Sequence, residues 1–275
     1  MFCGDKKKLL EDMAYLKPTV FASVARLYNK FFALMKAKVA NPTKGQFAGM
    51  FGGRCRLMIT ASAPISNEVK AFFINAIGVP MLEAYGQTEN TGLANITGKN
   101  DTVNGHVGGI CVSLEEKLVD IPDMDYLTSD VDENGKPTPR GEVCLRGYGV
   151  IPGYYMLDEK SKEVIDEHGW LHTGDVGEIL DTGAIKIIDR KKNLFKLSQG
   201  EYVAPEKIEN LYVKIPYIAE AFVFGDSLKD YCIGFFVADE NMLPMKAKQL
   251  GFEGTLEELC NNQELLAELW KDIYV

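Results

Sequence analysis

The sequence is short of histidine, of positive charge and of closely spaced cysteines, and each shortage excludes a class of protein. Its 275 residues include three histidines, and 30 lysines and arginines stand against 39 aspartates and glutamates, which gives a net charge of −9. This acidic balance argues against a general surface for nucleic acid or for an anionic membrane. An anionic substrate would therefore have to meet a local cluster of positive charge.

None of the six cysteines belongs to a C-x-x-C pair. This spacing predicts neither a disulfide framework nor a zinc site, and it favours a reducing, cytoplasmic compartment. His168 and His172 lie four residues apart, as two zinc ligands can, but Gly169 and Trp170 lie between them, so a structural role is favoured.

Long apolar runs are also missing. The N-terminal residues have no apolar stretch behind their basic residues, which argues against a secretory signal. The most apolar window nearby, "TVFASVARLYNKFFALM", contains Arg26 and Lys30 and is too interrupted to span a bilayer. We therefore expect a soluble chain, and its 46% hydrophobic residues are enough to bury at least one large core.

The pattern of apolar residues and turn residues divides the sequence into three successive parts. Residues 1–106 read as strands alternating with helices, which predicts part of a parallel sheet with crossover helices. Residues 107–189 contain short strands and turns, which predict a small β-barrel or a folded sheet. A basic hinge is predicted at 190–192, and an α+β pattern follows over 193–275. The predicted fold class is thus α/β with α+β.

Individual elements are predicted from local signals. "CRLMITA" and "VPMLEAYG" read as neighbouring strands, and the helical spacing from Val69 to Ile77 ends at Gly78, with Ser66 as a candidate N-cap. Farther on, Pro205 opens a helix, "AEAFVFG" and "YCIGFFVAD" read as strands, and the last thirty or so residues are predicted to be helical.

The stretch "EAYGQTENTG" over residues 83–92 has polar residues without apolar periodicity. Such a pattern after a glycine indicates either a binding loop or a polar turn capped by Thr88 or Asn90. The small residues of "ASAP" from Ala61 to Pro64 follow the preceding strand and read either as room for a ligand or as a tight connection.

Three motifs together resemble the adenylate-forming superfamily in their order along the chain: "YGQTE" at 85–89, "TGD" at 173–175 and "IDRKKNLFKLSQGEYVAPEKIE" at 188–209. The sequence in and around these motifs, including "GWLHTGDVGEIL" and "GFEGTLEELC", resembles the eukaryotic long-chain fatty acid–CoA ligases. The resemblance extends from "LKPTVFASVARLYN" onward, which is almost the whole chain.

This resemblance implies a ligase that uses Mg²⁺ and ATP to convert a long-chain fatty acid to acyl-AMP, from which CoA then displaces AMP. The family's phosphate loop and its catalytic lysine are not found in this sequence. We therefore expect an internal fragment, inactive alone, that holds the late part of the large N-terminal domain and most of the small C-terminal domain. Membrane association of the full-length protein would use a segment outside this chain.

The resemblance also implies roles for residues near the first motif. Tyr85 would lie against adenine, Thr88 would bind the α-phosphate, and Glu89 would bind magnesium, which prefers hard carboxylate ligands. Gly86 would let the nucleotide approach the strand end, and Ala61 would leave room for adenine.

The later motifs supply the remaining implied roles. Asp175 would accept hydrogen bonds from both ribose hydroxyls, and Arg190 would hold the ribose or phosphate from the other side. Lys192 would be the pivot between the two half-reactions, and Tyr202 would return to the adenine side. The alternative interpretations are an aspartate in a turn, a surface ion pair and a packed tyrosine.

Two other functions remain open at this stage. One is an adenylating ligase of another carboxylate, such as an aryl acid or an amino acid. The other is a non-catalytic nucleotide-binding or scaffold fragment. Neither alternative involves nucleic acid.

Overall fold

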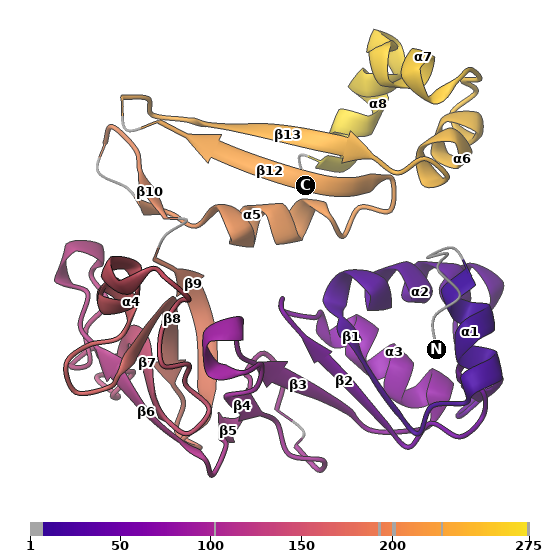
Figure 1. The fold of residues 1–275 in the computed structure, drawn as a ribbon. Coiled ribbons are helices and arrows are strands. Elements are labelled where there is room, and N and C mark those ends of the chain that lie inside the picture. Colours follow the sequence, from indigo (N-terminus) through magenta and orange to yellow (C-terminus); the bar gives the residue numbers. More distant parts are fainter. Residues whose placement is uncertain (1–7, 102, 192–193, 200–201, 227, 274–275) are drawn as a thin grey trace. The chain divides into compact units, whose positions relative to one another are not determined.

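The computed structural model describes residues 8–101, 103–191, 194–199, 202–226 and 228–273. The chain divides into two compact units, Met1–Ile188 and Asp189–Val275, which are described separately. Figure 1 labels the elements of both units. No helix within the described ranges is long and apolar enough to cross a membrane.

The first unit contains a five-stranded sheet in the order β1-β2-β3-β4-β5. Its parallel strands are β1 Val20–Val24, β2 Leu57–Ala61 and β3 Met81–Tyr85. Two short antiparallel strands complete it, β4 Asn95–Ile96 and β5 Gly109–Ile110. The predicted parallel strands with crossover helices are therefore confirmed.

Helices cover this sheet because apolar residues recur at helical spacing on their inner faces. They are α1 Leu9–Leu16, α2 Ala25–Lys38, the 3₁₀ helix η2 Ala48–Phe51 and α3 Asn67–Ile77. Helix α3 begins and ends as predicted, since the Ser66 side chain accepts from the Val69 N–H at 3.3 Å and Gly78 takes a φ of 82°. The fully buried rings of Tyr28, Phe51 and Phe73 meet edge to face in the core.

A second sheet of the first unit has the order β6-β7-β8-β9. Its strands are β6 Leu114–Val119, β7 Arg140–Gly147, β8 Leu171–Ile179 and β9 Ile185–Arg190. The last two residues of β9 already belong to the second unit. Of the two predicted forms, a small β-barrel or a folded sheet, the structure has the folded sheet, because the four strands form an open sheet and do not close into a barrel. Shorter elements in the loops are η3 Thr88–Asn90, η4 Pro122–Met124 and α4 Asp158–Val164.

Trp170 lies just before β8, and two cations contact its ring. The Lys117 Nζ is 4.4 Å from its ring centroid, and the Arg146 guanidinium carbon is 4.5 Å from it. Contacts of this kind stabilise the start of the strand through the quadrupole of the indole.

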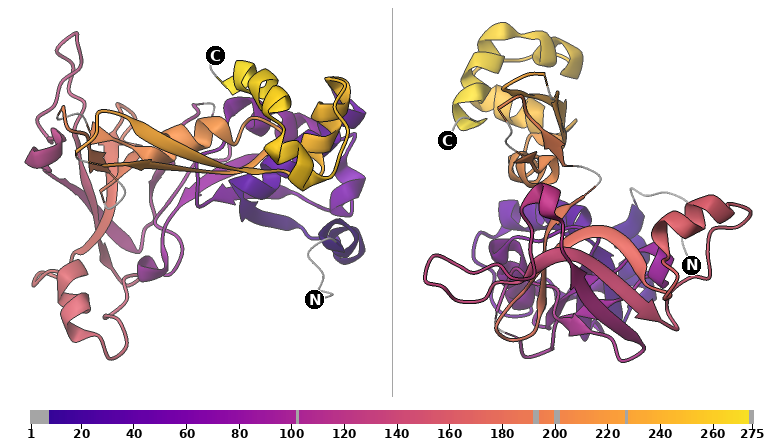
Figure 2. Two further views of the ribbon diagram at one scale, coloured as in Figure 1. Left: turned by 90° about the horizontal axis from the view of Figure 1, so that it is seen from above. Right: turned by 90° about the vertical axis from the view of Figure 1, so that its left-hand side faces the viewer.

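The second unit is built on a two-stranded antiparallel ribbon of β12 Ile218–Gly225 and β13 Cys232–Ala238. Before it come β10 Phe195–Lys196, β11 Tyr202–Val203 and α5 Pro205–Tyr212, and after it come α6 Met242–Gln249, α7 Leu256–Asn261 and α8 Gln263–Ile273. Figures 1 and 2 show these last three helices gathered at one end of the ribbon. The predicted helix at Pro205, both predicted strands and the helical C-terminal segment are confirmed.

Candidate active site

The two sheets of the first unit are joined by a hydrogen bond between residues that the sequence predicted for one site. The Tyr85 hydroxyl, at the end of β3, donates to the Asp175 Oδ2 in β8 at 2.7 Å. Burial and then the Asp175 charge raise the pKa of the Tyr85 phenol, so the hydroxyl stays protonated and able to donate. The "YGQTE" and "TGD" motifs, which are 90 residues apart at this contact, therefore meet.

The segment of β8 that carries Asp175 bulges from its sheet. Cys144 of β7 pairs with His172 and Glu142 pairs with Val176, so β8 has two more residues than β7 between these pairs. A bulge re-aims the side chains that it carries, and bulges are common beside active sites. The residues of "TGD" are those that leave the ladder, which points the Asp175 carboxylate toward the end of β3.

Hydrogen bonds hold the bulge in one conformation. The Thr173 hydroxyl donates to the Val143 carbonyl at 2.7 Å and accepts from the Asp175 N–H at 3.1 Å. The Gly174 N–H donates to the Glu142 Oε1 at 3.1 Å. The Gln87 Nε2, from the loop after β3, reaches the Thr173 carbonyl at 3.4 Å.

Gly86 is needed by the loop that follows it. A Cβ at this position would lie 2.5 Å from the Gly92 carbonyl oxygen and 2.7 Å from its carbon. Since both contacts are with backbone, a side chain would force the loop to move. The structure thus gives the glycine a structural reason besides the approach of the nucleotide that the resemblance implies.

The polar residues after Gly86 form the single turn η3. Asn90 is fully buried at the third position of the turn, and its Oδ1 accepts from the N–H of the N-cap residue, Gln87, at 2.6 Å. It thus belongs to a capping box, although the N-cap itself is Gln87 and not Thr88 or Asn90 as the alternative interpretation proposed. Thr88 is exposed, and the half-buried Glu89 accepts a 2.7 Å hydrogen bond from the Tyr154 hydroxyl at its Oε1. This bond raises the pKa of Tyr154.

Ala61 ends β2, next to the end of β3. Thr60 pairs with Glu83 in the parallel register, so the carboxyl ends of both strands lie at one edge of the sheet, where ligands bind in open α/β sheets. Ala61 is half-buried, and Ser62 after it has a φ of 74°, a conformation that a non-glycine residue adopts only at some cost in energy.

The remaining predicted residues belong to the second unit. Arg190 is exposed, and its Nη1 lies 3.5 Å from the Glu206 Oε1. Tyr202 is half-buried in β11, opposite Lys196 in the register. Lys192 lies outside the described residues.

Sequence reasoning missed four participants: Gln87, Glu142, Tyr154 and Thr173 as a hydrogen-bonding residue. Gln87 and Thr173 were inside quoted motifs, and their polar side chains were the available signal. Nothing in the sequence links Tyr154 with Glu89 or Glu142 with Gly174, because both contacts depend on tertiary structure.

The set of donors fits the ligands that the resemblance implies. A carboxylate such as Glu89 suits Mg²⁺, which takes one or two protein carboxylates and fills its other positions with water and substrate phosphate. The buried Asp175, held at the sheet junction, offers an anionic acceptor that suits vicinal hydroxyl groups.

Comparison with known proteins gives a consistent result. Residues 3–155 match the family of AMP-binding enzymes. The chain is 40% identical over 303 residues to long-chain-fatty-acid–CoA ligase 5 of Mus musculus, covering 99% of this chain and 43% of that protein. It is also 40% identical to the peroxisomal long chain acyl-CoA synthetase 6 of Arabidopsis thaliana, covering 98% of this chain and 42% of the relative.

Solved structures agree in fold. The adenylation domain of a carboxylate reductase from Mycobacterium chelonae has a TM-score of 0.74 and 30% identity, covering 90% of this chain and 39% of that one. The A domain of a carboxylic acid reductase from Segniliparus rugosus, solved with AMP and a co-purified carboxylic acid, has a TM-score of 0.72 and 26% identity, covering 92% and 43%. The predicted adenylate-forming fold is therefore confirmed.

The resemblance to long-chain fatty acid–CoA ligases is likewise confirmed, although the chain spans less than half the length of these relatives. The match to the AMP-binding family covers more than half of the 275 residues. The chain therefore belongs to the family of AMP-binding enzymes.

Proposed function

We propose that this chain is part of an ATP-dependent ligase that activates a long-chain fatty acid as acyl-AMP and transfers the acyl group to CoA. The observation that carries the proposal is the 2.7 Å hydrogen bond between Tyr85 and Asp175, because it unites two motifs of the resemblance at the open end of a parallel sheet. The similarity to long-chain fatty acid–CoA ligases supports the choice of acid.

In this proposal the residues of the first unit bind and orient the nucleotide. Asp175 accepts from the ribose hydroxyls, while the Tyr85 hydroxyl fixes the carboxylate and its ring lies against adenine. Thr88 donates to the α-phosphate and Ala61 borders the base. Mg²⁺ bound through Glu89 supplies neutralisation of phosphate charge, and Tyr154 orients that carboxylate.

The residues of the second unit serve the second half-reaction. Arg190 contacts the ribose or phosphate, Lys192 is the pivot of a domain rotation, and Tyr202 approaches the adenine side after rotation. We place the ligase in the cytoplasm or on the cytosolic face of a membrane, with fatty acid, ATP and CoA as its ligands.

The test uses the complete open reading frame that contains this chain. Palmitate-dependent exchange of pyrophosphate into ATP measures adenylation, and benzoate in place of palmitate measures the choice of acid. Asp175→Ala is expected to reduce transition-state stabilisation with ATP by about 2–4 kcal/mol, since two hydrogen bonds to a charged group are lost. The control is Asp158→Ala, on an exposed position of α4.

Exchange that depends on palmitate, together with a loss confined to Asp175→Ala, would support the proposal. Near-normal ATP kinetics in Asp175→Ala would remove that residue from the site. Exchange with benzoate but not palmitate would identify a ligase of another acid, and no exchange with any acid would favour the non-catalytic alternative.

A further inference from the structure

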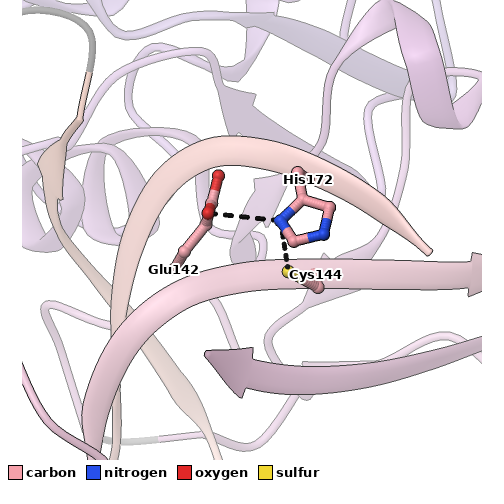
Figure 3. Close-up of side chains that lie close together, drawn as sticks. All are labelled: Glu142, Cys144 and His172. Carbon is pink, nitrogen blue, oxygen red and sulfur yellow. Dashed lines mark hydrogen bonds and ion pairs between the residues drawn. The ribbon is translucent and has the colours of Figure 1, made fainter. Parts of the chain in front are cut away.

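Three potential metal ligands meet beside the bulge of β8. Glu142 and Cys144 come from β7 and His172 from β8, and their ligand atoms all lie within 4.8 Å of one another. Figure 3 shows the His172 Nδ1 directed at both neighbours. It is 3.3 Å from the Glu142 Oε2 and 3.4 Å from the Cys144 Sγ.

Two of the three spacings match those of a tetrahedral zinc site, and the third, between the Glu142 oxygen and the Cys144 Sγ, is at most 4.8 Å. Zinc binds sulfur at about 2.3 Å and nitrogen or oxygen at about 2.0–2.2 Å. With tetrahedral angles, such bonds separate sulfur from nitrogen by about 3.6 Å and nitrogen from oxygen by about 3.3–3.4 Å. The two distances from the Nδ1 are thus close to the edges of a zinc tetrahedron.

One ring nitrogen cannot hydrogen-bond both neighbours fully. The Nδ1 carries either one proton or one lone pair. With a proton, it divides a single donor between the Glu142 Oε2 at 3.3 Å and the Cys144 Sγ at 3.4 Å. With a lone pair, it can accept the Cys144 S–H, and it then has no proton to donate to the Glu142 Oε2. A cation between the three atoms could bind all of them at once.

Neighbouring groups orient two of the ligands. The Glu142 Oε1 accepts from the Gly174 N–H at 3.1 Å, which leaves Oε2 directed at the imidazole. The Asp166 Oδ2 lies 3.7 Å from the other ring nitrogen of His172, Nε2. A carboxylate beside the second nitrogen is the usual companion of a metal-binding histidine, because it favours the tautomer with its proton on Nε2.

We propose that Glu142, Cys144 and His172 form a binding site for Zn²⁺ that is separate from the magnesium site expected at Glu89. The mixed set of sulfur, nitrogen and oxygen donors suits zinc rather than Mg²⁺ or Ca²⁺. Zn²⁺ displaces the thiol proton of Cys144, which leaves as H⁺, and His172 binds as neutral imidazole through Nδ1. Water completes the tetrahedron, and the half-exposed His172 gives the ion a route from solvent.

Metal at this position would stabilise the segment that carries Asp175. Glu142 would be held both by the ion and by the Gly174 N–H, so the bulge would be pinned to β7. The role is one of positioning, because Glu142 acts on the bulge through the Gly174 N–H, next to Asp175 in the chain.

The experiment uses Co²⁺ and Zn²⁺ on the 275-residue chain, purified without a histidine tag and kept reduced. Co²⁺ bound to a thiolate gives a sulfur-to-cobalt charge-transfer band in the near ultraviolet, which a site of oxygen and nitrogen ligands lacks. The band is expected to saturate at one equivalent and to be displaced by Zn²⁺. Cys144→Ser should abolish the band, because it removes the sulfur ligand. Asp166→Asn should weaken Co²⁺ binding by about 10–100-fold, as is typical when a residue that orients a ligand is lost. His172→Gln removes a ligand itself and should weaken Co²⁺ binding by more than about 100-fold.

The matched controls are Cys111→Ser and His168→Gln, which change the same residue types outside the cluster and should keep the band. Far-ultraviolet circular dichroism establishes that each variant is folded. If Cys144→Ser does not fold, the weaker Co²⁺ binding expected of His172→Gln and Asp166→Asn tests the proposal instead. Absence of the band in the unaltered chain, or its persistence in Cys144→Ser, would overturn the proposal. Neither result would bear on the proposed ligase activity.

Discussion

The loop after β3 passes so close to Gly86 that this position has no room for a side chain. Gly86→Ala would place a Cβ 2.5 Å from the Gly92 carbonyl oxygen. We expect it to lower the free energy of unfolding by about 1–3 kcal/mol, because the loop backbone has to shift to make room. Urea denaturation measures the change.

The matched control for this prediction is Gly109→Ala in β5. A Cβ there has no neighbour within 4 Å and Gly109 does not have a positive φ, so little change is expected. Equal stability of the two alanine variants would mean that the loop after β3 yields without cost.

Glu116 in β6 illustrates a second effect of single residues. Burial raises the pKa of its carboxyl, an effect that the hydrogen bond from the Asn95 Nδ2 at 3.1 Å offsets only partly. The Oε1 of this carboxylate is buried without a hydrogen-bond partner. The charged form is therefore disfavoured in the folded chain.

The sign of the pH dependence follows from that shift. A carboxyl with a raised pKa in the folded state contributes stability below its unfolded pKa, about 4.3, and this contribution is lost as pH rises through the folded pKa. Glu116→Gln should therefore gain stability relative to the unaltered chain as pH rises from about 4 to 7. Urea denaturation across this range, with the exposed Glu133→Gln as control, tests it. A constant difference between Glu116→Gln and the unaltered chain would refute the shift.

At the scale of elements, an ion pair fastens α3 to β3. Lys70 of α3 and Glu83 of β3 are both buried, and the Lys70 Nζ lies 2.8 Å from the Glu83 Oε1. Lys70→Met leaves the Glu83 charge buried without its partner, and we expect a loss of about 3–5 kcal/mol in the free energy of unfolding. The double variant with Glu83→Leu should recover most of this loss, because it removes both charges.

Lys36→Met is the control, since it breaks the exposed pair between Lys36 of α2 and Glu68 and should cost less than about 1 kcal/mol. Chemical denaturation of the four chains gives the comparison. A Lys70→Met variant as stable as Lys36→Met would show that the Glu83 carboxylate becomes protonated or hydrated when its partner is removed.

The elements around this pair show what local sequence determines. The positions of β2, α3 and β3 were predictable, because apolar spacing, Ser66 and Gly78 act within a few residues of one another. The open form of the β6–β9 sheet was not, because closure depends on strand number and tilt. Lys70 follows the buried Val69 on its helix, and nothing local indicates that a lysine there is paired across 13 residues.

For the candidate site, motifs identified the segments and the structure supplied the contacts. Tyr85 and Asp175 were both predicted to be site residues, but their hydrogen bond depends on how two sheets join. Cysteine spacing could not indicate the cluster of Glu142, Cys144 and His172, because the cluster arises from the pairing of two strands.

At the scale of the whole molecule, the proposed function requires two half-reactions. Lys192→Pro, at the proposed pivot, fixes φ and should hinder rotation while leaving adenylation possible. In the complete ligase we expect acyl-AMP to form and thioester formation to fall, measured as pyrophosphate exchange and as acyl-CoA. Lys192→Ala, which keeps φ free, is the control. Equal losses in both half-reactions would indicate general damage and not a blocked hinge.

The chain has two tryptophans, and each compact unit contains one. Trp170 contacts two cationic side chains in the first unit, while Trp270 in α8 contacts the Phe236 ring at 6.1 Å between centroids. Replacing one indole at a time by phenylalanine would leave a single intrinsic fluorophore whose emission reports one unit alone. The melting of each unit can thus be followed optically in the intact chain, without an added label.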